Sequence, residues 1–338
     1  MPSQLFSADR FRIPGAADGD AILVEGGIVS ALGSRDDFGA DQPETRIDGA
    51  VILPGMRDAH LHPVAYAAAL RGATLAAAAD FDDLAARLAA AADRSPGPVL
   101  GMRLNEETLA ERRLPDRRVL DAAVADRPLL AHRYCGHVAV ANSAALALAG
   151  IDAATAEPIG GSIDRDDDGM PTGVLRETAI DLVAERLEGG NAVGVDELLS
   201  AMQRLAAAGI TSIGAMLRTG AGAWASLGNE VDVTVAASDR LPIRVAAYVI
   251  EEAPGAVIDN KARIDAAGPR LTWRGIKRFG DGSFGGHTAA MYEPYIDVDA
   301  TGTMRLSALD RAIAEESLRL GGASAIHAIG DRACGELI

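Results

Sequence analysis

Four apolar runs in the second half of the chain place the strongest constraint on its fold. They lie at residues 210–216, 243–250, 273–279 and 324–329, and segments with helical periodicity separate most of them. Nearly continuous apolar strands alternating with helices are typical of a parallel sheet covered on both faces. A similar run at 51–62 precedes them. No glycine-rich dinucleotide fingerprint follows any of these runs, so an eight-stranded (β/α) barrel is favoured over a Rossmann sheet.

The rest of the chain is predicted to form two further parts. Residues 21–24 and 28–32 flank a glycine-containing turn, which indicates a β-hairpin within a small β domain over 1–52. Residues 53–338 then form the barrel, with a long insertion at about 64–208 between its first and second strands. The elements predicted in the insertion are helices at 64–95, 178–187 and 195–208 and strands at 99–102 and 128–134.

Charge and cysteine content argue against several classes of protein. The net charge is −16, from 48 acidic against 32 basic residues, and no basic stripe is present, which argues against nucleic-acid and anionic-membrane partners. Arg71 and Asp80 interrupt the most alanine-rich region, so no membrane span is expected there. Residues 1–12 lack the apolar core of a signal peptide, so no targeting segment is expected. Cys135 and Cys334 are far apart and do not resemble a disulfide framework, so we expect a cytoplasmic location.

A His-x-His sequence closes the first predicted strand. Because alternate side chains of a strand share a face, Asp58, His60 and His62 are expected to point the same way. Two imidazoles placed like this can hold one metal ion. The alternative is a pair of unrelated histidines, one packed in the core and one in solvent.

Two later strands carry polar residues that fit the same site. Lys277 shares a face with Phe279 and can point into the barrel, where a neutral amine can react with CO2 to give a carbamate that bridges two metal ions. The alternative is an ordinary surface charge beside Arg278. His327 lies near the end of its strand and is either a metal ligand or a satisfied packing residue.

Other polar segments supply candidates for substrate binding. The segment 132–137 contains Arg133 and His137 and is either part of a substrate pocket or a polar turn. Asp281 lies in a glycine-rich segment that lacks the spacing of a phosphate loop, and it is a third candidate. The acidic run 164–169 lacks the ligand pattern of a calcium loop, so we expect a solvated turn there.

Taken together, these segments resemble the amidohydrolase superfamily of metal-dependent hydrolases. More narrowly, the chain is similar to the YtcJ-like branch, which includes N-substituted formamide deformylases. The similar segments are LPGMRDAHLH at 53–62, RYCGH at 133–137, NSAAL at 142–146, GSIDRDDDGMPTGVLRE at 161–177, GITSI at 209–213, GIKRFGDGSFGGHTAAMYEPY at 275–295 and AIHAIGDRA at 325–333. They follow one another in order over almost the whole chain.

The resemblance implies a metal-dependent-hydrolase (β/α)8 barrel beside a small β-sandwich to which residues 1–52 contribute. It implies that His60 and His62 on the first strand, a carbamylated Lys277 on the fourth and His327 on the fifth hold one or two divalent ions, expected to be zinc. Asp58 is then expected to orient a histidine from outside the metal's ligand set.

The family pattern also contains parts that this chain lacks. A sixth-strand histidine and an eighth-strand aspartate, the catalytic base, are expected beyond residue 338, so the barrel is expected to be truncated after its fifth strand. The implied activity is hydrolysis of a non-peptide C–N bond in a small amide, N-formyl or N-acyl amine through a metal-activated water. The alternative is a non-catalytic or degraded barrel that serves as a binding or regulatory scaffold. A homodimer is a further expectation.

Overall fold

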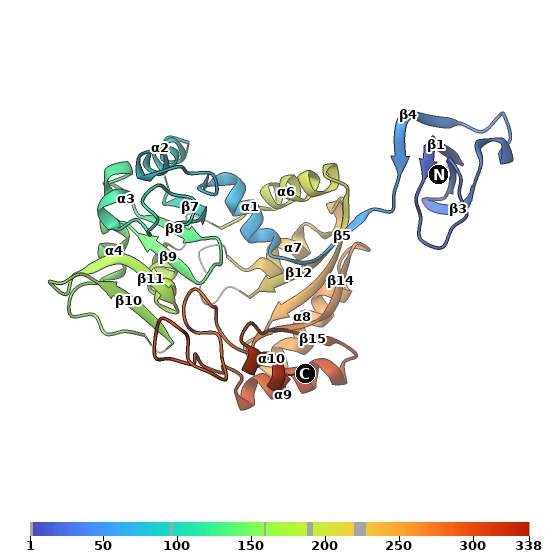
Figure 1. Ribbon diagram of the computed structural model, residues 1–338. Coiled ribbons are helices and arrows are strands. Elements are labelled where there is room, and N and C mark those ends of the chain that lie inside the picture. Colours follow the sequence, from blue (N-terminus) through green and yellow to red (C-terminus); the bar gives the residue numbers. More distant parts are fainter. Residues whose placement is uncertain (1–2, 95–96, 159, 188–191, 220–227, 338) are drawn as a thin grey trace. The chain divides into compact units, whose positions relative to one another are not determined.

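The structure, a computed structural model, divides into two compact units, Met1–Met56 and Arg57–Ile338 (Figure 1). It describes residues 3–94, 97–158, 160–187, 192–219 and 228–337. Among the helices of these residues, none combines the length and the apolar character that crossing a membrane requires.

The first unit contains one four-stranded sheet. Its strands are β1 (Gln4–Phe11), β2 (Ala21–Glu25), β3 (Ile28–Gly33) and β4 (Glu44–Ile52), in the order β3-β2-β1-β4. The predicted hairpin is confirmed, because β2 and β3 pair antiparallel and Gly26 and Gly27 between them have φ values of 58° and 82°. A second sheet, which a sandwich requires, is not present among residues 3–56.

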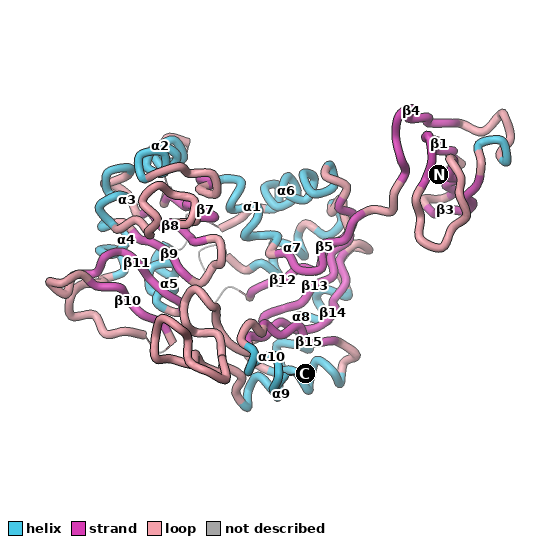
Figure 2. The backbone as a smooth tube through the Cα atoms, viewed as in Figure 1, coloured by secondary structure: helices cyan, strands magenta, loops and turns pink. Residues whose placement is uncertain are grey.

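Five strands of the second unit form the parallel sheet that the apolar runs predict. They are β5 (Met56–Leu61), β12 (Ile210–Arg218), β13 (Arg244–Ile250), β14 (Leu271–Phe279) and β15 (Ala323–His327). Their order in the sheet follows the chain, and β12, β13, β14 and β15 pair in parallel. Sequential parallel strands with helical crossovers are the arrangement of a (β/α) barrel. These five form an open half-barrel (Figure 2).

An α-helix follows each of β12, β13, β14 and β15 along the chain. They are α7 (Glu230–Ala236), α8 (Pro254–Asp265), α9 (Ala308–Arg319) and α10 (Asp331–Leu337). Three of these starts have a local cause in the sequence. Asn229 accepts a hydrogen bond from the backbone N–H of Asp232 at the start of α7, and Pro254 occupies the first turn of α8. Ser307 and Asp310 form a reciprocal capping box at the start of α9.

The part of the chain between β5 and β12 forms a second sheet of six strands. Its strands are β6 (Ala73–Thr74), β7 (Val99–Leu104), β8 (Leu129–Arg133), β9 (Val138–Ala141), β10 (Gly161–Arg165) and β11 (Pro171–Glu177), in the order β10-β11-β9-β8-β7-β6. The accompanying helices are α1 (Pro63–Arg71), α2 (Phe81–Ala92), α3 (Arg117–Ala123), α4 (Ser143–Ala149), α5 (Ala179–Ala184) and α6 (Val195–Ala207). β6, β7 and β8 are parallel, and the remaining neighbours are antiparallel.

The helical pattern over 64–95 is divided into two helices, which corrects the single helical stretch expected from the sequence. A Cβ on Gly72 would lie 2.5 Å from the carbonyl oxygen of Leu100, so only glycine allows the chain to turn this close to β7 at the end of α1. Asp80 then accepts a hydrogen bond from the backbone N–H of Asp83 at 2.8 Å and begins α2.

One hydrophobic core joins the insertion to the half-barrel. It includes Val64 of α1, Leu198 and Met202 of α6, Leu217 of β12 and Val249 of β13, all of which have no exposed surface. Each such side chain contributes about 1.5–3 kcal/mol through its removal from water. This shared core therefore packs the two sheets of the second unit into one compact unit.

Candidate metal centre

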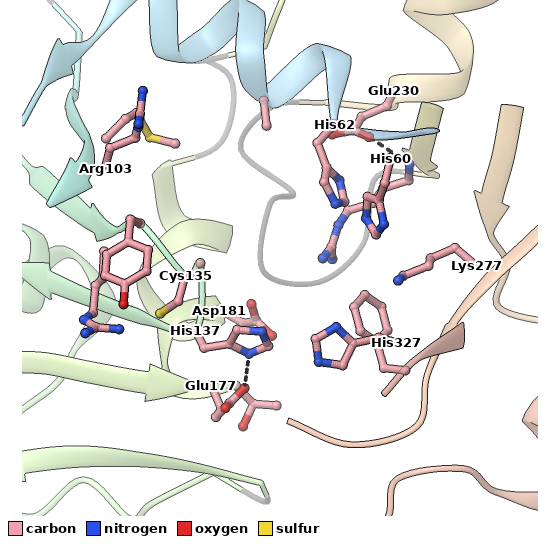
Figure 3. Close-up of a pocket in the computed structure, with 18 of the residues that line it drawn as sticks. His60, His62, Arg103, Cys135, His137, Glu177, Asp181, Glu230, Lys277 and His327 are labelled. Atoms are coloured by element: carbon pink, nitrogen blue, oxygen red, sulfur yellow. Dashed lines mark hydrogen bonds and ion pairs between the residues drawn. The ribbon is translucent and has the colours of Figure 1, made fainter. Parts of the chain in front are cut away.

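Polar side chains from the half-barrel and the insertion surround one cavity of about 530 Å³. Its lining includes His60, His62, Arg103, Arg133, Cys135, His137, Glu177, Asp181, Arg218, Glu230, Lys277, Phe279, Arg305 and His327. The half-barrel residues come from the carboxyl ends of β5, β12, β14 and β15, where barrel active sites are built. Figure 3 shows His60, His62, Lys277 and His327 around one opening, with His137 on the side of the insertion.

The two histidines of the His-x-His sequence lie side by side at the end of β5. Their ring centroids are 5.6 Å apart. Burial, followed by the charge of Arg218, lowers the pKa of His62 to about 3, and burial followed by Lys277 lowers the pKa of His60. Both imidazoles are therefore neutral at pH 7, which is the state that binds metal. Asp58 accepts a hydrogen bond from the backbone N–H of His60 at 3.0 Å, so its contact is to the backbone and not to a ring.

Lys277 is buried, which excludes the surface position that the sequence left open. It is 2% exposed, and its Nζ lies 5.2 Å from the centre of the Phe279 ring. Burial, followed by the nearby Arg218, lowers the pKa of Lys277 to about 8. With this pKa about a tenth of the amine is unprotonated at pH 7, and the unprotonated amine is the form that reacts with CO2.

His327 ends β15 with one ring nitrogen already fixed. Its Nε2 lies 2.8 Å from the carbonyl oxygen of Gly282, and since a carbonyl only accepts, Nε2 carries the proton. The lone pair of Nδ1 is then the one available to a metal. This is the usual arrangement of a metal-binding histidine, whose second nitrogen donates to a carbonyl or carboxylate. Burial lowers the pKa of His327.

The three candidates for substrate binding lie in different surroundings. Arg133 lines the cavity at the end of β8, but its guanidinium pairs with Glu106 at 2.7 Å. His137 lines the cavity from the β8–β9 turn, so the polar turn and the pocket wall are the same segment. Asp281 is fully buried and is not brought to the cavity lining with the other two. Its carboxylate accepts the backbone N–H groups of Ala290, Ile329 and Gly330 at 3.0, 3.0 and 2.7 Å.

Glu177 holds His137 against the cavity. Its Oε2 lies 2.9 Å from Nδ1 of His137, and its backbone N–H donates to the His137 carbonyl. The same carboxylate accepts the hydroxyl of Thr288 at 2.5 Å and pairs with Arg305 at 3.3 Å, so it joins the insertion to the loop after β14. Burial alone would raise the pKa of Glu177, but hydrogen bonds from His137 and Thr288 lower it overall. Glu177 has a φ of 52°, a conformation uncommon outside glycine.

The cavity also contains a group of buried charges near His62. Arg218 ends β12, and its backbone N–H donates to Oε2 of Glu230 at 2.9 Å. Burial raises the pKa of Glu230 to about 7 and that of Asp181 to about 6. Burial also disfavours the charged form of Arg218 and lowers its pKa, although the carboxyl groups of Glu230 and Asp181 oppose this change.

The histidines alone do not make a complete metal site, and they need Lys277 to complete the set of ligands. Among the residues the structure describes, no three His, Cys, Asp or Glu side chains are grouped closely enough to hold an ion. Carbamylation of Lys277 would add two oxygen atoms that share one negative charge. The donor set of neutral imidazoles and a reactive amine is therefore compatible with a divalent ion, and the carbamate is the part that would complete it.

Sequence reasoning missed several cavity residues, and Arg218 and Glu177 illustrate two different reasons. Arg218 closes an apolar strand, so the rule that barrel sites form at carboxyl ends could have nominated it. Glu177 meets Thr288, which is 111 positions away, and no local pattern in the sequence indicates that contact.

A parallel half-barrel with this cavity at its carboxyl edge has the fold of metal-dependent hydrolases. A solved structure described as an uncharacterized metal-dependent hydrolase from Pyrococcus horikoshii OT3 superimposes with a TM-score of 0.67 at 25% identity, covering 99% of this chain and 66% of that one. The sequence model of the amidohydrolase family matches residues 47–338, and the chain belongs to that family.

Two relatives place the chain within the family. YtcJ of Bacillus subtilis, named as an amidohydrolase, is 31% identical over 337 residues, which cover 93% of this chain and 60% of YtcJ. The N-substituted formamide deformylase of Arthrobacter pascens is 32% identical over 207 residues, 57% of this chain and 38% of the relative. The predicted resemblance to the YtcJ-like branch is confirmed. The chain spans less than two thirds of the length of either relative.

Proposed function

We propose that this chain carries the metal-binding part of a hydrolase that cleaves a non-peptide C–N bond in a small amide, N-formyl or N-acyl amine. The observation that supports the proposal most is the convergence of three neutral histidines and one buried lysine from β5, β14 and β15 on a single cavity. The amidohydrolase family and the deformylase relative support the bond type.

Lysine usage supports a special role for Lys277. Only two of the 32 basic residues are lysines, Lys261 and Lys277, and the remainder are arginines. Lys261 pairs with Asp265 on α8, whereas Lys277 is buried in the cavity wall. An arginine stays charged in any protein, whereas a buried lysine can lose its proton. A lysine at position 277 is thus consistent with a need for a neutral amine and its carbamate.

In the proposed site His60, His62 and His327, together with a carbamylated Lys277, would hold one or two divalent ions. A divalent ion, proposed to be zinc, supplies Lewis acidity that polarises a carbonyl and lowers the pKa of water. The Gly282 carbonyl keeps the His327 ring in one tautomer. Glu177 and its bond to His137 keep that imidazole turned toward the substrate side of the cavity. We assign proton transfer to none of the residues that the structure describes.

The carbamate can be tested directly, because there are only two lysines to distinguish. Purified protein is incubated with zinc and ¹³C-bicarbonate, and carbamate carbons are observed by ¹³C NMR. We expect a resonance in the wild type and in Lys261→Arg, and none in Lys277→Arg. Loss of the resonance in the Lys261 variant instead would refute the assignment. Hydrolysis of a panel of N-formyl and N-acyl amines by the whole protein tests the bond type, and no turnover of any member would refute it.

We also propose that the sheet of the first unit is one layer of a β-sandwich. Several apolar side chains of this sheet are exposed, among them Ile28 at 72%, Ile47 at 56% and Val29 at 53%. A second layer would remove such surface from water. A small-molecule substrate, a cytoplasmic location and a homodimer stay predictions.

A further inference from the structure

Arg218 lies at the carboxyl end of β12, in the same cavity wall as the candidate metal ligands. Its charge contributes to the lowered pKa values of both His62 and Lys277, so its guanidinium lies within electrostatic reach of each. Phe279 lies under it, with 6.0 Å between the guanidinium carbon and the ring centre. The cation is therefore next to the place where the scissile bond would lie.

The pairing of Arg218 differs from that of two other arginines in the cavity wall. Arg133 is neutralised by Glu106 at 2.7 Å, and Arg305 by Glu177 at 3.3 Å. Arg218 forms no ion pair with any residue that the structure describes, and its Nε is buried without a hydrogen-bond partner. Glu230 and Asp181 oppose the effect of burial on the Arg218 pKa, but neither forms an ion pair with its guanidinium. A desolvated N–H group without an acceptor is costly, and a ligand that accepts from it would remove that cost.

Asp181 presents a complementary atom in the same wall. Its Oδ1 is buried and has no hydrogen-bond partner among the described residues, and its charge is felt by Arg218. Both side chains line the cavity. A ligand that places an anionic oxygen at Arg218 and an N–H group beside it would satisfy both atoms at once.

We propose that Arg218 is a specificity residue that binds the carboxylate of the substrate, and that the substrate class is N-acyl amino acids. The amide N–H of such a compound lies next to its carboxylate and can donate to Asp181. The planar guanidinium fork matches the two oxygen atoms of a carboxylate. Asp181 and Glu230 would repel a phosphate dianion in the same place, so a monoanion is the better fit.

This inference rests on the proposed function in one respect, namely that the cavity holds the amide bond to be cleaved. Its test therefore measures binding and hydrolysis separately. The probes are N-acetylglycine and its neutral isostere N-acetylglycinamide, titrated by calorimetry into the zinc-loaded whole protein. We expect the carboxylate to bind about 10- to 100-fold more tightly, as for a charge-assisted bidentate pair.

Arg218→Met is expected to abolish this preference, and Arg218→Lys, which keeps the charge and loses the fork, to reduce it at least threefold. The lysine variant decides the question if the methionine variant does not fold. Arg103→Met is the matched control, because Arg103 is an exposed arginine of the same cavity wall. It is expected to keep the wild-type preference.

The possible results separate the two proposals. Loss of the preference in Arg103→Met and not in Arg218→Met would overturn the assignment. Unchanged preference together with lost zinc in Arg218→Met would also overturn it, since the arginine would then serve the Lys277 carbamate. Carboxylate preference that depends on Arg218, with no hydrolysis of either probe, would leave the subsite standing and refute the hydrolase. Hydrolysis of both probes with equal kcat/KM would support the hydrolase and overturn the subsite.

Discussion

Asp281 offers a quantitative test of how the half-barrel holds its last strand. Its fully buried carboxylate accepts three backbone N–H groups, at distances of 3.0, 3.0 and 2.7 Å. Two of the donors, Ile329 and Gly330, lie two and three residues after His327, and the third is Ala290 in the loop after β14. Replacement by alanine leaves three buried donors without an acceptor. At about 1–3 kcal/mol for each donor the cost is about 3–9 kcal/mol.

Water entering the space left by the carboxylate would recover part of that cost, so we expect Asp281→Ala to lower the free energy of unfolding by about 3–5 kcal/mol. This is a large share of the roughly 5–15 kcal/mol of a natural domain. Urea unfolding followed by circular dichroism measures the loss. Hydrogen exchange of the Ile329 and Gly330 amides measures its local cause, and both amides are expected to exchange faster.

Asp297→Ala is the matched control, because Asp297 lies in the same loop, its side chain is 69% exposed, and its carboxylate lies 3.0 Å from Nε2 of His287 instead of accepting buried backbone N–H groups. Its expected change in the free energy of unfolding is below about 0.5 kcal/mol. A loss smaller than about 1 kcal/mol for Asp281→Ala, with unchanged exchange of the two amides, would refute the view that this carboxylate fastens the His327 strand.

Three more outcomes are expected. Lys277→Ala should lose at least about one zinc ion per chain by atomic absorption while Lys261→Ala keeps the wild-type content, and equal contents would contradict the metal-binding role of Lys277. Glu177→Gln should fold normally but lower kcat/KM of the whole protein about 10- to 100-fold, since His137 loses its anionic partner; wild-type kinetics would exclude that positioning role. In metal-free protein, His62 binds a proton near pH 6.5 when unfolded and near pH 3 when folded, so stability falls as pH drops through that window. Between pH 7.5 and 5 the wild type should lose about 1–2 kcal/mol more than His62→Gln, allowing for partial solvent screening, and parallel losses would argue against it.

The parallel half-barrel was predictable because each of its strands can be recognised from its own residues alone. A run such as 243–250 is apolar at nearly every position, and this needs no knowledge of its neighbours. The histidines at 60, 62 and 327 were predictable as candidates because they end such runs. The break in the helical pattern at Gly72 was not, since it depends on the close approach of the Leu100 carbonyl from another strand.

The electrostatic part of the site was the least accessible from sequence. Lys277 could be a surface charge or a buried amine, and only the packing of β14 between β13 and β15 decides for burial. The bond from Thr288 to Glu177 joins the loop after β14 to the end of β11, and neither sequence context hints at the other. Periodicity reports which face of an element is buried, but not which buried charges meet.

The order of strands in the half-barrel has a consequence for how the protein is made. β5 pairs with β12, and Arg57 donates to the hydroxyl of Ser212 across a separation of 155 positions. A ribosome adding about 5–20 residues per second leaves β5 without its neighbour for about 8–30 s. During that time the sheet of the insertion can form from contacts nearer in sequence, which brings the ends of the intervening chain together before β5 and β12 meet. The strand that contains His60 and precedes His62 would then be among the later parts to gain order, and pulse-labelled hydrogen exchange would detect this as late protection of β5 relative to β7 and β8.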